Sequence, residues 1–153
     1  MRRETFKPEE YRRAALERLS SAKRAVGAGD YVEAVYIAGV AIECMLRGYR
    51  VRLDQSFDEG HDLWKLAHAS HILQRIPDRK QERVRGALQT AKRRWANDHR
   101  YRSSDALLTY FRKHHLAREG PRFLRRALER NASELVEAAE TIVTVGDQQS
   151  WDL

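Results

Sequence analysis

The sequence predicts an all-α fold, an antiparallel bundle of five to six helices. Apolar residues recur at helical spacing almost throughout, and no stretch of four or more residues alternates like a half-buried strand. The helical segments are joined by short connections, which favour antiparallel neighbours. With 153 residues, of which 42% are hydrophobic, the chain can bury a real core. We expect one domain over residues 1–146 and a flexible tail over 147–153.

The first helix is predicted over residues 8–26. Pro8 suits the first position of a helix, because its missing N–H would have no helical partner there. Gly27 and Gly29 are expected to end the helix. One face is apolar at spacings of three and four residues, through Tyr11, Ala15, Leu19, Ala22 and Val26.

The second helix is predicted over residues 31–53 and is the most apolar part of the chain, so we expect it at the centre. Asp30 followed by Glu33 has the spacing of a capping box. Gly39 lowers helix propensity and therefore predicts close approach of a neighbouring helix. A lone buried carboxylate is costly, so Glu43 is expected to make a structural hydrogen bond.

A loop is predicted over residues 54–60, followed by a short helix over residues 61–73 that Pro77 ends. Asp78 with Gln81 indicates a capping box for a fourth helix. The fourth helix has an apolar face at spacings of four, three and four residues, formed by Val84, Leu88, Ala91 and Trp95.

The last third of the chain predicts two more helices. Ser103 or Ser104 caps a fifth helix, which is broken before Gly120 and Pro121. A long final helix follows, which we expect Gly146 to end. Its inward face is predicted to hold Leu124, Leu128, Ala132, Leu135, Ala139 and Ile142.

The net charge of +7 is concentrated in one part of the chain. Residues 74–130 carry 17 Lys or Arg against 6 Asp or Glu, whereas the remainder carries 12 against 16. A local positive field favours a polyanionic partner, because phosphate contacts release counterions. The alternative is a solvated surface on arginine-rich helices.

Several site classes receive little support from the sequence. Cys44 is the single cysteine, so neither an intrachain disulfide nor a cysteine zinc site is expected. His68 and His71 share a helix but lack further ligands nearby, and we predict neither a metal nor another cofactor. No apolar run is long enough to span a membrane, and the expected compartment is the cytoplasm.

The stretch RRWANDHRYRS, residues 93–103, carries the residues with the strongest chemical interest. RNA cleavage needs proton transfer at the 2′-hydroxyl and at the leaving oxygen, and positive charge beside the phosphorane. Histidine suits proton transfer near neutral pH, and arginine suits the charge. On an unbroken helix Arg94 and His99 would lie about 140° apart. We therefore expect the helix to end after Asn97 or Asp98, so that a loop turns His99 toward the guanidinium.

Three segments resemble the HEPN family of small helical-bundle proteins. YVEAVYIAGVAIECMLRGY has the family's spaced alanines followed by a glutamate and a leucine–basic pair, and GHDLWKL is similar to the start of its next helix. Arg94, four residues, His99, one residue and Tyr101 match the spacing of the family's ribonuclease signature. The resemblance covers about residues 11–145 and implies a HEPN-like bundle.

For activity, the resemblance implies a metal-independent endoribonuclease with its site in a homodimer cleft. Arg94 would stabilise the transition state and His99 would act as acid or base. Tyr101 would orient the site or receive adenylate from a nucleotidyltransferase partner in a toxin–antitoxin system. The cations expected to contact RNA are Lys92, Arg93, Arg100 and Arg102.

The same segment leaves other readings open. Trp95 stands where active members carry a small polar residue, and Trp95 with Arg100 and Tyr101 also matches HEPN proteins without nuclease function. Arg93 offers a second register, in which the polar Arg94 follows the arginine. The alternatives are thus a noncatalytic module that binds a nucleotidyltransferase or another protein, and nonspecific nucleic-acid binding by the basic segment.

Overall fold

Six α-helices and two short 3₁₀ helices make up the regular structure of the described residues, among which no strand occurs. The structure, a computed structural model, describes residues 6–53, 60–118 and 124–149. The elements in chain order are α1 (Pro8–Gly27), α2 (Tyr31–Val51), α3 (Leu63–Ser70), η1 (Ile72–Arg75), α4 (Asp78–Arg94), η2 (Asn97–Tyr101), α5 (Ser104–Lys113) and α6 (Leu124–Asp147). The predicted all-α class is confirmed.

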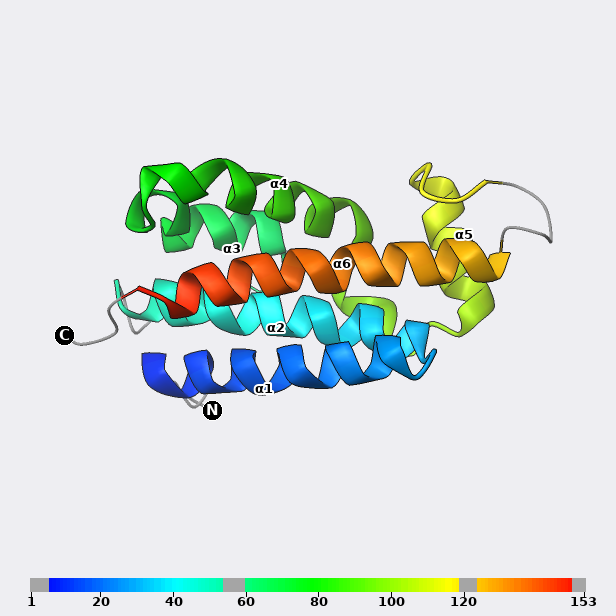
Figure 1. Cartoon of the computed structure of the whole chain (residues 1–153), viewed down its shortest axis with the longest axis horizontal. Coiled ribbons are helices and arrows are strands. Elements are labelled where there is room, and N and C mark those ends of the chain that lie inside the picture. Colours follow the sequence, from blue (N-terminus) through cyan, green and yellow to red (C-terminus); the bar gives the residue numbers. More distant parts are fainter. Residues whose placement is uncertain (1–5, 54–59, 119–123, 150–153) are drawn as a thin grey trace.

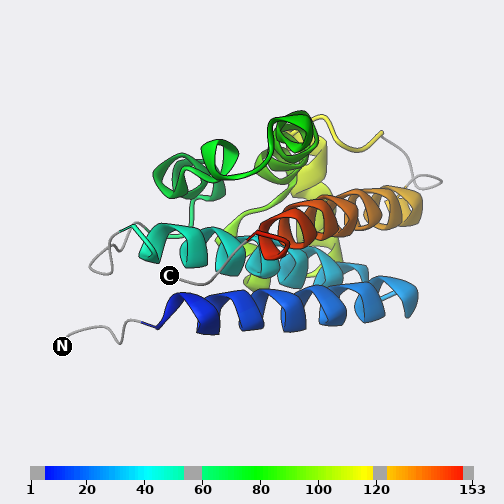
Figure 2. The same ribbon diagram turned by 60° about the vertical axis from the view of Figure 1, so that its left-hand side comes forward.

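The long helices form an antiparallel bundle with α2 at its centre (Figure 1). Helices α1, α2 and α6 lie along the long axis, and α2 runs opposite to α1. Helix α4 packs on α6, and α3 packs on α2, so that these two cover one side of the bundle (Figure 2). Helix α5 crosses one end of the bundle at a steep angle. The central position follows from composition, since most residues of α2 are buried.

Several predicted boundaries are wrong by a few residues. The helix expected over residues 61–73 is interrupted at His71, whose φ of 54° places it in the left-handed region. The capping box at the start of α2 does not form, because the side chain of Asp30 makes no capping hydrogen bond although the residue stands at the cap. The fourth helix ends at Arg94, before the predicted position. The loop predicted over residues 54–60 lies, apart from Gly60, outside the described residues.

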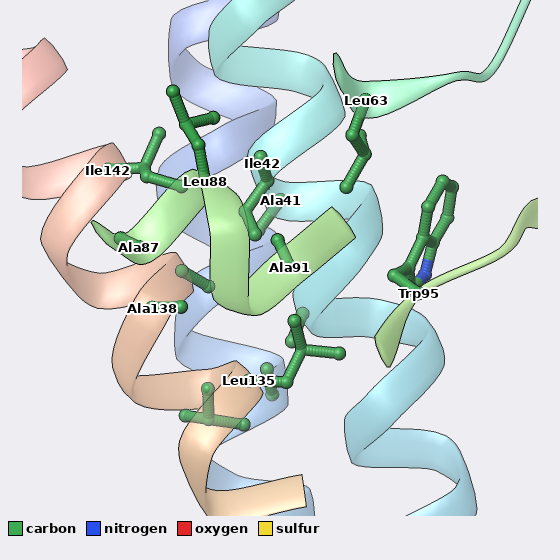
Figure 3. Packing of buried hydrophobic residues seen from close by; sticks show 14 of the residues in the cluster. Ala41, Ile42, Leu63, Ala87, Leu88, Ala91, Trp95, Leu135, Ala138 and Ile142 are labelled. Carbon is green, nitrogen blue, oxygen red and sulfur yellow. The ribbon is translucent and has the colours of Figure 1, made fainter. Parts of the chain in front are cut away.

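A close contact between α2 and the residue after α4 explains Gly39. A Cβ atom at Gly39 would lie 1.9 Å from Nε1 of Trp95 and 2.0 Å from its Cδ1. Figure 3 shows Trp95 beside the α2 ribbon, at the edge of the buried cluster. The predicted close approach is therefore present, but it is made by an indole ring and not by a helix backbone.

The predicted end of the last helix is wrong as well, because α6 continues through Gly146 to Asp147. The carbonyl oxygen of Gly146 accepts a hydrogen bond of 2.8 Å from the hydroxyl of Tyr49. A Cβ at Gly146 would lie 2.9 Å from Met45, so this glycine serves packing against α2 and does not end the helix. Of the predicted tail, residues 150–153 lie outside the described part.

Candidate functional site

The chain leaves α4 abruptly after Arg94. Trp95 has extended backbone angles, and its indole N–H donates a hydrogen bond of 3.1 Å to the carbonyl oxygen of Tyr36 in α2. The Trp95 and Tyr36 rings stack with centroids 6.5 Å apart. The prediction that Trp95 is a core residue is confirmed, since it is buried. Because Trp95 packs on α2, the chain leaves the α4 helix at this residue and begins the turn that contains η2.

His99 is built into this turn as a structural residue. Its side chain is almost fully enclosed, with 1% of the residue exposed. Nε2 lies 2.7 Å from the main-chain oxygen of Arg94, which can only accept a hydrogen bond, so Nε2 carries the proton. Nδ1 then accepts a hydrogen bond of 3.0 Å from Arg102. Both ring nitrogens are therefore occupied, and the imidazole closes the carboxyl end of α4.

The surroundings of His99 favour the neutral imidazole. Burial lowers its pKa, and the nearby charge of Arg102 acts in the same direction. The Tyr110 ring packs edge-on against the imidazole with centroids 4.5 Å apart. Nε2 faces the main chain, and Arg102 covers Nδ1. A substrate could therefore exchange a proton with Nδ1 only after Arg102 had moved away.

Arg94 points toward α6 and is also bound within the fold. Its Nε donates to Oδ1 of Asn131 at 3.1 Å, one terminal nitrogen donates to the carbonyl oxygen of Thr90 at 3.2 Å, and the other pairs with Glu134. Only 11% of the side chain is exposed. Asn131 is itself fully buried and donates to the carbonyl oxygen of Leu116 at 2.9 Å. Arg94 thus ties the end of α4 to α6.

These contacts contradict the expected geometry of the motif. The loop does return His99 to Arg94, but to its main-chain carbonyl and not to its guanidinium. The two side chains are covered by different partners, Arg102 on one and Glu134 on the other. The expectation that the loop turns His99 toward the Arg94 guanidinium is wrong, because both side chains complete hydrogen bonds that close the end of α4.

The remaining motif residues lie on the outside. Tyr101 is 76% exposed, and the guanidinium of Arg100 lies over its ring at 4.6 Å from the centroid. Arg93 is exposed and makes no ion pair among the residues that the structure describes. Arg102 is half-buried, bonded to Asp98 at 2.5 Å and stacked over Tyr110. Arg93, Arg100 and Tyr101 are therefore free to meet a partner, whereas Arg102 is largely engaged.

One part of the surface was missed by sequence reasoning. Trp64 lies in α3 and is half-buried, and the ammonium group of Lys92 lies over its ring at 4.6 Å from the centroid. A hollow of about 580 Å³ opens beside this pair, between the start of α3 and the connection from α4 to η2. The available signal was that Trp64 falls between Leu63 and the polar Lys65, off the face shared by Leu63, Leu66 and Ala67.

The buried carboxylate of α2 has the structural role that was expected. Oε1 of Glu43 lies 2.5 Å from Nδ1 of His61 and 3.3 Å from the guanidinium of Arg47. Arg47 also donates to the carbonyl oxygen of Gly60. This network fixes the chain just before α3 against α2, and so helps to place Trp64 and the hollow.

Within the described residues no group of three or more His, Cys, Asp or Glu side chains is placed to hold a metal ion. His68 instead packs edge-on against Trp64, with ring centroids 5.1 Å apart. His114 lies against Tyr110 at 4.1 Å between centroids. Among the same residues, no helix has the length and apolar character needed to cross a bilayer.

Fold and site together define a small antiparallel helical-bundle protein with a basic, aromatic surface where its fourth helix ends. The model of the HEPN domain family matches residues 8–149, nearly the whole chain, and the chain belongs to the HEPN family. Comparisons with curated proteins and with solved structures gave no significant match.

Proposed function

We propose that this chain is a noncatalytic HEPN module that binds single-stranded RNA through the surface formed by the end of α4 and by η2. One observation carries the proposal: the Arg94 and His99 side chains are bonded within the fold, whereas the cations beside them are exposed. In this structure Nε2 of His99 is bonded to a main-chain oxygen and Nδ1 to Arg102, so the imidazole presents no open nitrogen to a substrate. Exposed cations beside exposed aromatic rings are what a flexible polyanion requires.

The character of the exposed groups favours unpaired RNA over duplex. The Tyr101 ring and the Arg100 guanidinium form a stacked pair that presents flat surfaces to solvent. Flat aromatic and guanidinium groups stack on splayed bases, which a duplex keeps inside. Lys92 and Arg93, on the last turn of α4 and a few residues earlier in the chain, are exposed cations as well. Binding therefore combines phosphate neutralisation with stacking.

The direct test uses purified protein and a labelled single-stranded RNA in the presence of a chelator. We expect binding without cleavage. If the three exposed cations each contact a phosphate, the logarithm of the association constant falls linearly with the logarithm of the salt concentration, with a slope of about −2. The triple variant Lys92→Glu, Arg93→Glu, Arg100→Glu is expected to lose most of the affinity while it keeps the wild-type melting temperature. Reversal of the exposed Lys113 alone serves as the control.

Two outcomes would contradict this function. Chelator-resistant cleavage that leaves cyclic phosphate ends, and that disappears in His99→Ala and Arg94→Ala variants shown to remain folded at the assay temperature, would establish the ribonuclease reading. Salt-independent binding, or none, would remove the nucleic-acid role. The homodimer and the nucleotidyltransferase partner remain predictions, and analytical ultracentrifugation and co-purification from the native cells test them.

A further inference from the structure

The hollow beside Trp64 joins an aromatic wall to positive charge. Trp64 and Trp95 contribute apolar surface, Lys65 and Lys92 contribute ammonium groups, and Asn97 contributes an amide. Its volume of about 580 Å³ falls within the range of small-ligand sites, about 300–1,000 Å³. Since Asn97 is also the first residue of η2, the hollow adjoins the surface that carries Arg100 and Tyr101.

Two side chains lie against the Trp64 ring: His68 packs edge-on, and the ammonium group of Lys92 lies over the ring. Lys92 comes from the last turn of α4 and is itself exposed, so its ammonium group can swing away without loss of core packing. A cation over an exposed ring is held weakly, whereas a base stacked on an aromatic ring contributes more to affinity. A base can therefore displace Lys92 from the ring, and the displaced ammonium group stays close enough to meet the phosphate.

The charges around the hollow suit a phosphate as well. Neither Lys65 nor Lys92 forms an ion pair within the described part of the chain. The one carboxylate in the lining, that of Asp62, accepts a hydrogen bond of 3.0 Å from the main-chain N–H of Lys65. His61, which also lines the hollow, is bonded to Glu43. Two unpaired cations thus face the space, opposed by one carboxylate that already caps α3.

Asn97 supplies the polar group that such a site needs beside the ring. Its side-chain amide makes no hydrogen bond to the residues that the structure describes, and Asn97 lines the hollow together with Trp95. An amide both donates and accepts, so it can pair with the edge of a flipped-out base. An acidic peptide would use the two lysines but would leave the indole face and this amide without matching partners.

We infer that this hollow is a nucleotide subsite, in which one unpaired base stacks on Trp64 beside Asn97 while Lys65 and Lys92 contact the adjoining phosphate. The inference rests on the proposed binding of single-stranded RNA and assigns it a specific anchoring point. A free nucleoside monophosphate and an unpaired residue within a strand share this chemistry, and the two sources are separated by the experiment.

The experiment titrates the full-length protein with adenosine monophosphate, with an eight-residue oligoadenylate and with a duplex of the same length, and follows tryptophan fluorescence and anisotropy. Trp64→Leu is expected to weaken oligoadenylate binding about tenfold and to abolish most of the quenching, since one stacked base is lost. Trp64→Phe keeps a flat ring and is expected to restore most of the affinity. Binding of the duplex changes little in either variant.

Quenching by the monophosphate alone would identify a free-nucleotide site, and quenching by the oligomer alone would identify a strand subsite; both support the subsite. If Trp64→Leu binds oligoadenylate as wild type does, with the same salt dependence, the subsite is wrong and the proposed function stands. If wild-type protein binds none of the three nucleic-acid probes, both fall together. Equal Trp64-dependent binding of polyglutamate would assign the hollow to acidic peptides instead. Melting temperatures of both variants exclude loss of fold as the cause.

Discussion

The indole ring of Trp95 occupies the space that a side chain at residue 39 would need. A Cβ built on Gly39 lies within 2.2 Å of three atoms of that ring. The indole N–H is also bonded to the carbonyl oxygen of Tyr36, one turn earlier in α2. Together these contacts determine where α4 ends, because the chain can place the ring on α2 only by leaving the helix at Arg94.

Gly39→Ala is therefore expected to destabilise the protein although alanine is the better helix former. The displaced indole is rigid and buried, and overpacking of this kind costs about 1–3 kcal/mol of the free energy of unfolding. Gly86→Ala, inside α4, is the matched control: its Cβ would meet nothing within 4 Å, so a gain of about 0.4–1 kcal/mol is expected. Urea unfolding of both variants measures these differences. Equal changes in the two would contradict the close packing at Gly39.

The buried imidazole of His99 predicts a pH dependence of stability. Burial lowers its pKa below the ordinary 6.5, so the unfolded chain takes up this proton first as the pH falls. The free energy of unfolding is then expected to decrease as the pH falls from about 6.5 toward the lowered pKa of the folded state. Asp98, whose pKa is also lowered, titrates below its ordinary 3.8 and leaves this window unaffected. Melting temperatures between about pH 7.5 and pH 5 measure the effect.

His99→Gln serves as the comparison for this prediction. Its amide can donate to the carbonyl oxygen of Arg94 but carries no titratable proton in this range. The difference between the wild-type and variant curves isolates His99, since every other titratable group is common to the two proteins. Two parallel curves would show that His99 does not resist protonation in the folded state.

Arg94 is predicted to be a stability residue. Arg94→Ala leaves Asn131 with an unsatisfied amide oxygen and removes the bonds to Glu134 and to the carbonyl of Thr90, at a cost of about 1–3 kcal/mol. Its neighbour Arg93 is exposed, and Arg93→Ala is expected to change stability by less than about 0.5 kcal/mol. Thermal unfolding of the pair is the measurement. Equal stability of the two variants would mean that the contacts of Arg94 to α6 contribute nothing.

Cys44 is predicted to resist alkylation in the folded protein. Burial raises the pKa of its thiol to about 11, so the reactive thiolate is scarce at neutral pH. Mass spectrometry after iodoacetamide treatment at neutral pH is expected to find it unmodified in native protein and modified in urea. Rapid labelling of native protein would indicate that α2 opens locally or that the thiol is accessible.

The fold was predictable because its signals are local. Helical spacing and the capping residue Ser103 identify helices from neighbouring residues alone. The apolar composition of α2 predicted its central position in the bundle. The geometry of the motif was not predictable in the same way. Arg94 is held by Asn131 and Glu134, which lie about 40 residues further along the chain. No pattern around residue 94 indicates these two partners.

The end of α4 shows the same limit. Counting residues placed Trp95 on a continuing helical face, whereas a hydrogen bond to Tyr36, 59 residues earlier, sets the actual boundary. Burial of Trp95 was predicted correctly for its apolar character, although it does not continue the helix. Nothing in the sequence indicated the contact between Trp64 and Lys92, because the two residues are 28 positions apart.

The hydrogen bond from His99 to the main-chain oxygen of Arg94 means that the arginine and the histidine of a nuclease signature can both be required by the fold alone. A histidine five residues after the last helical arginine binds the loop to the end of the helix. Selection for this hydrogen bond would keep the same spacing as selection for cleavage. Surveys that count such spacings would group scaffolds with enzymes. The spacing alone therefore does not separate a histidine that holds a turn in place from one that cleaves RNA.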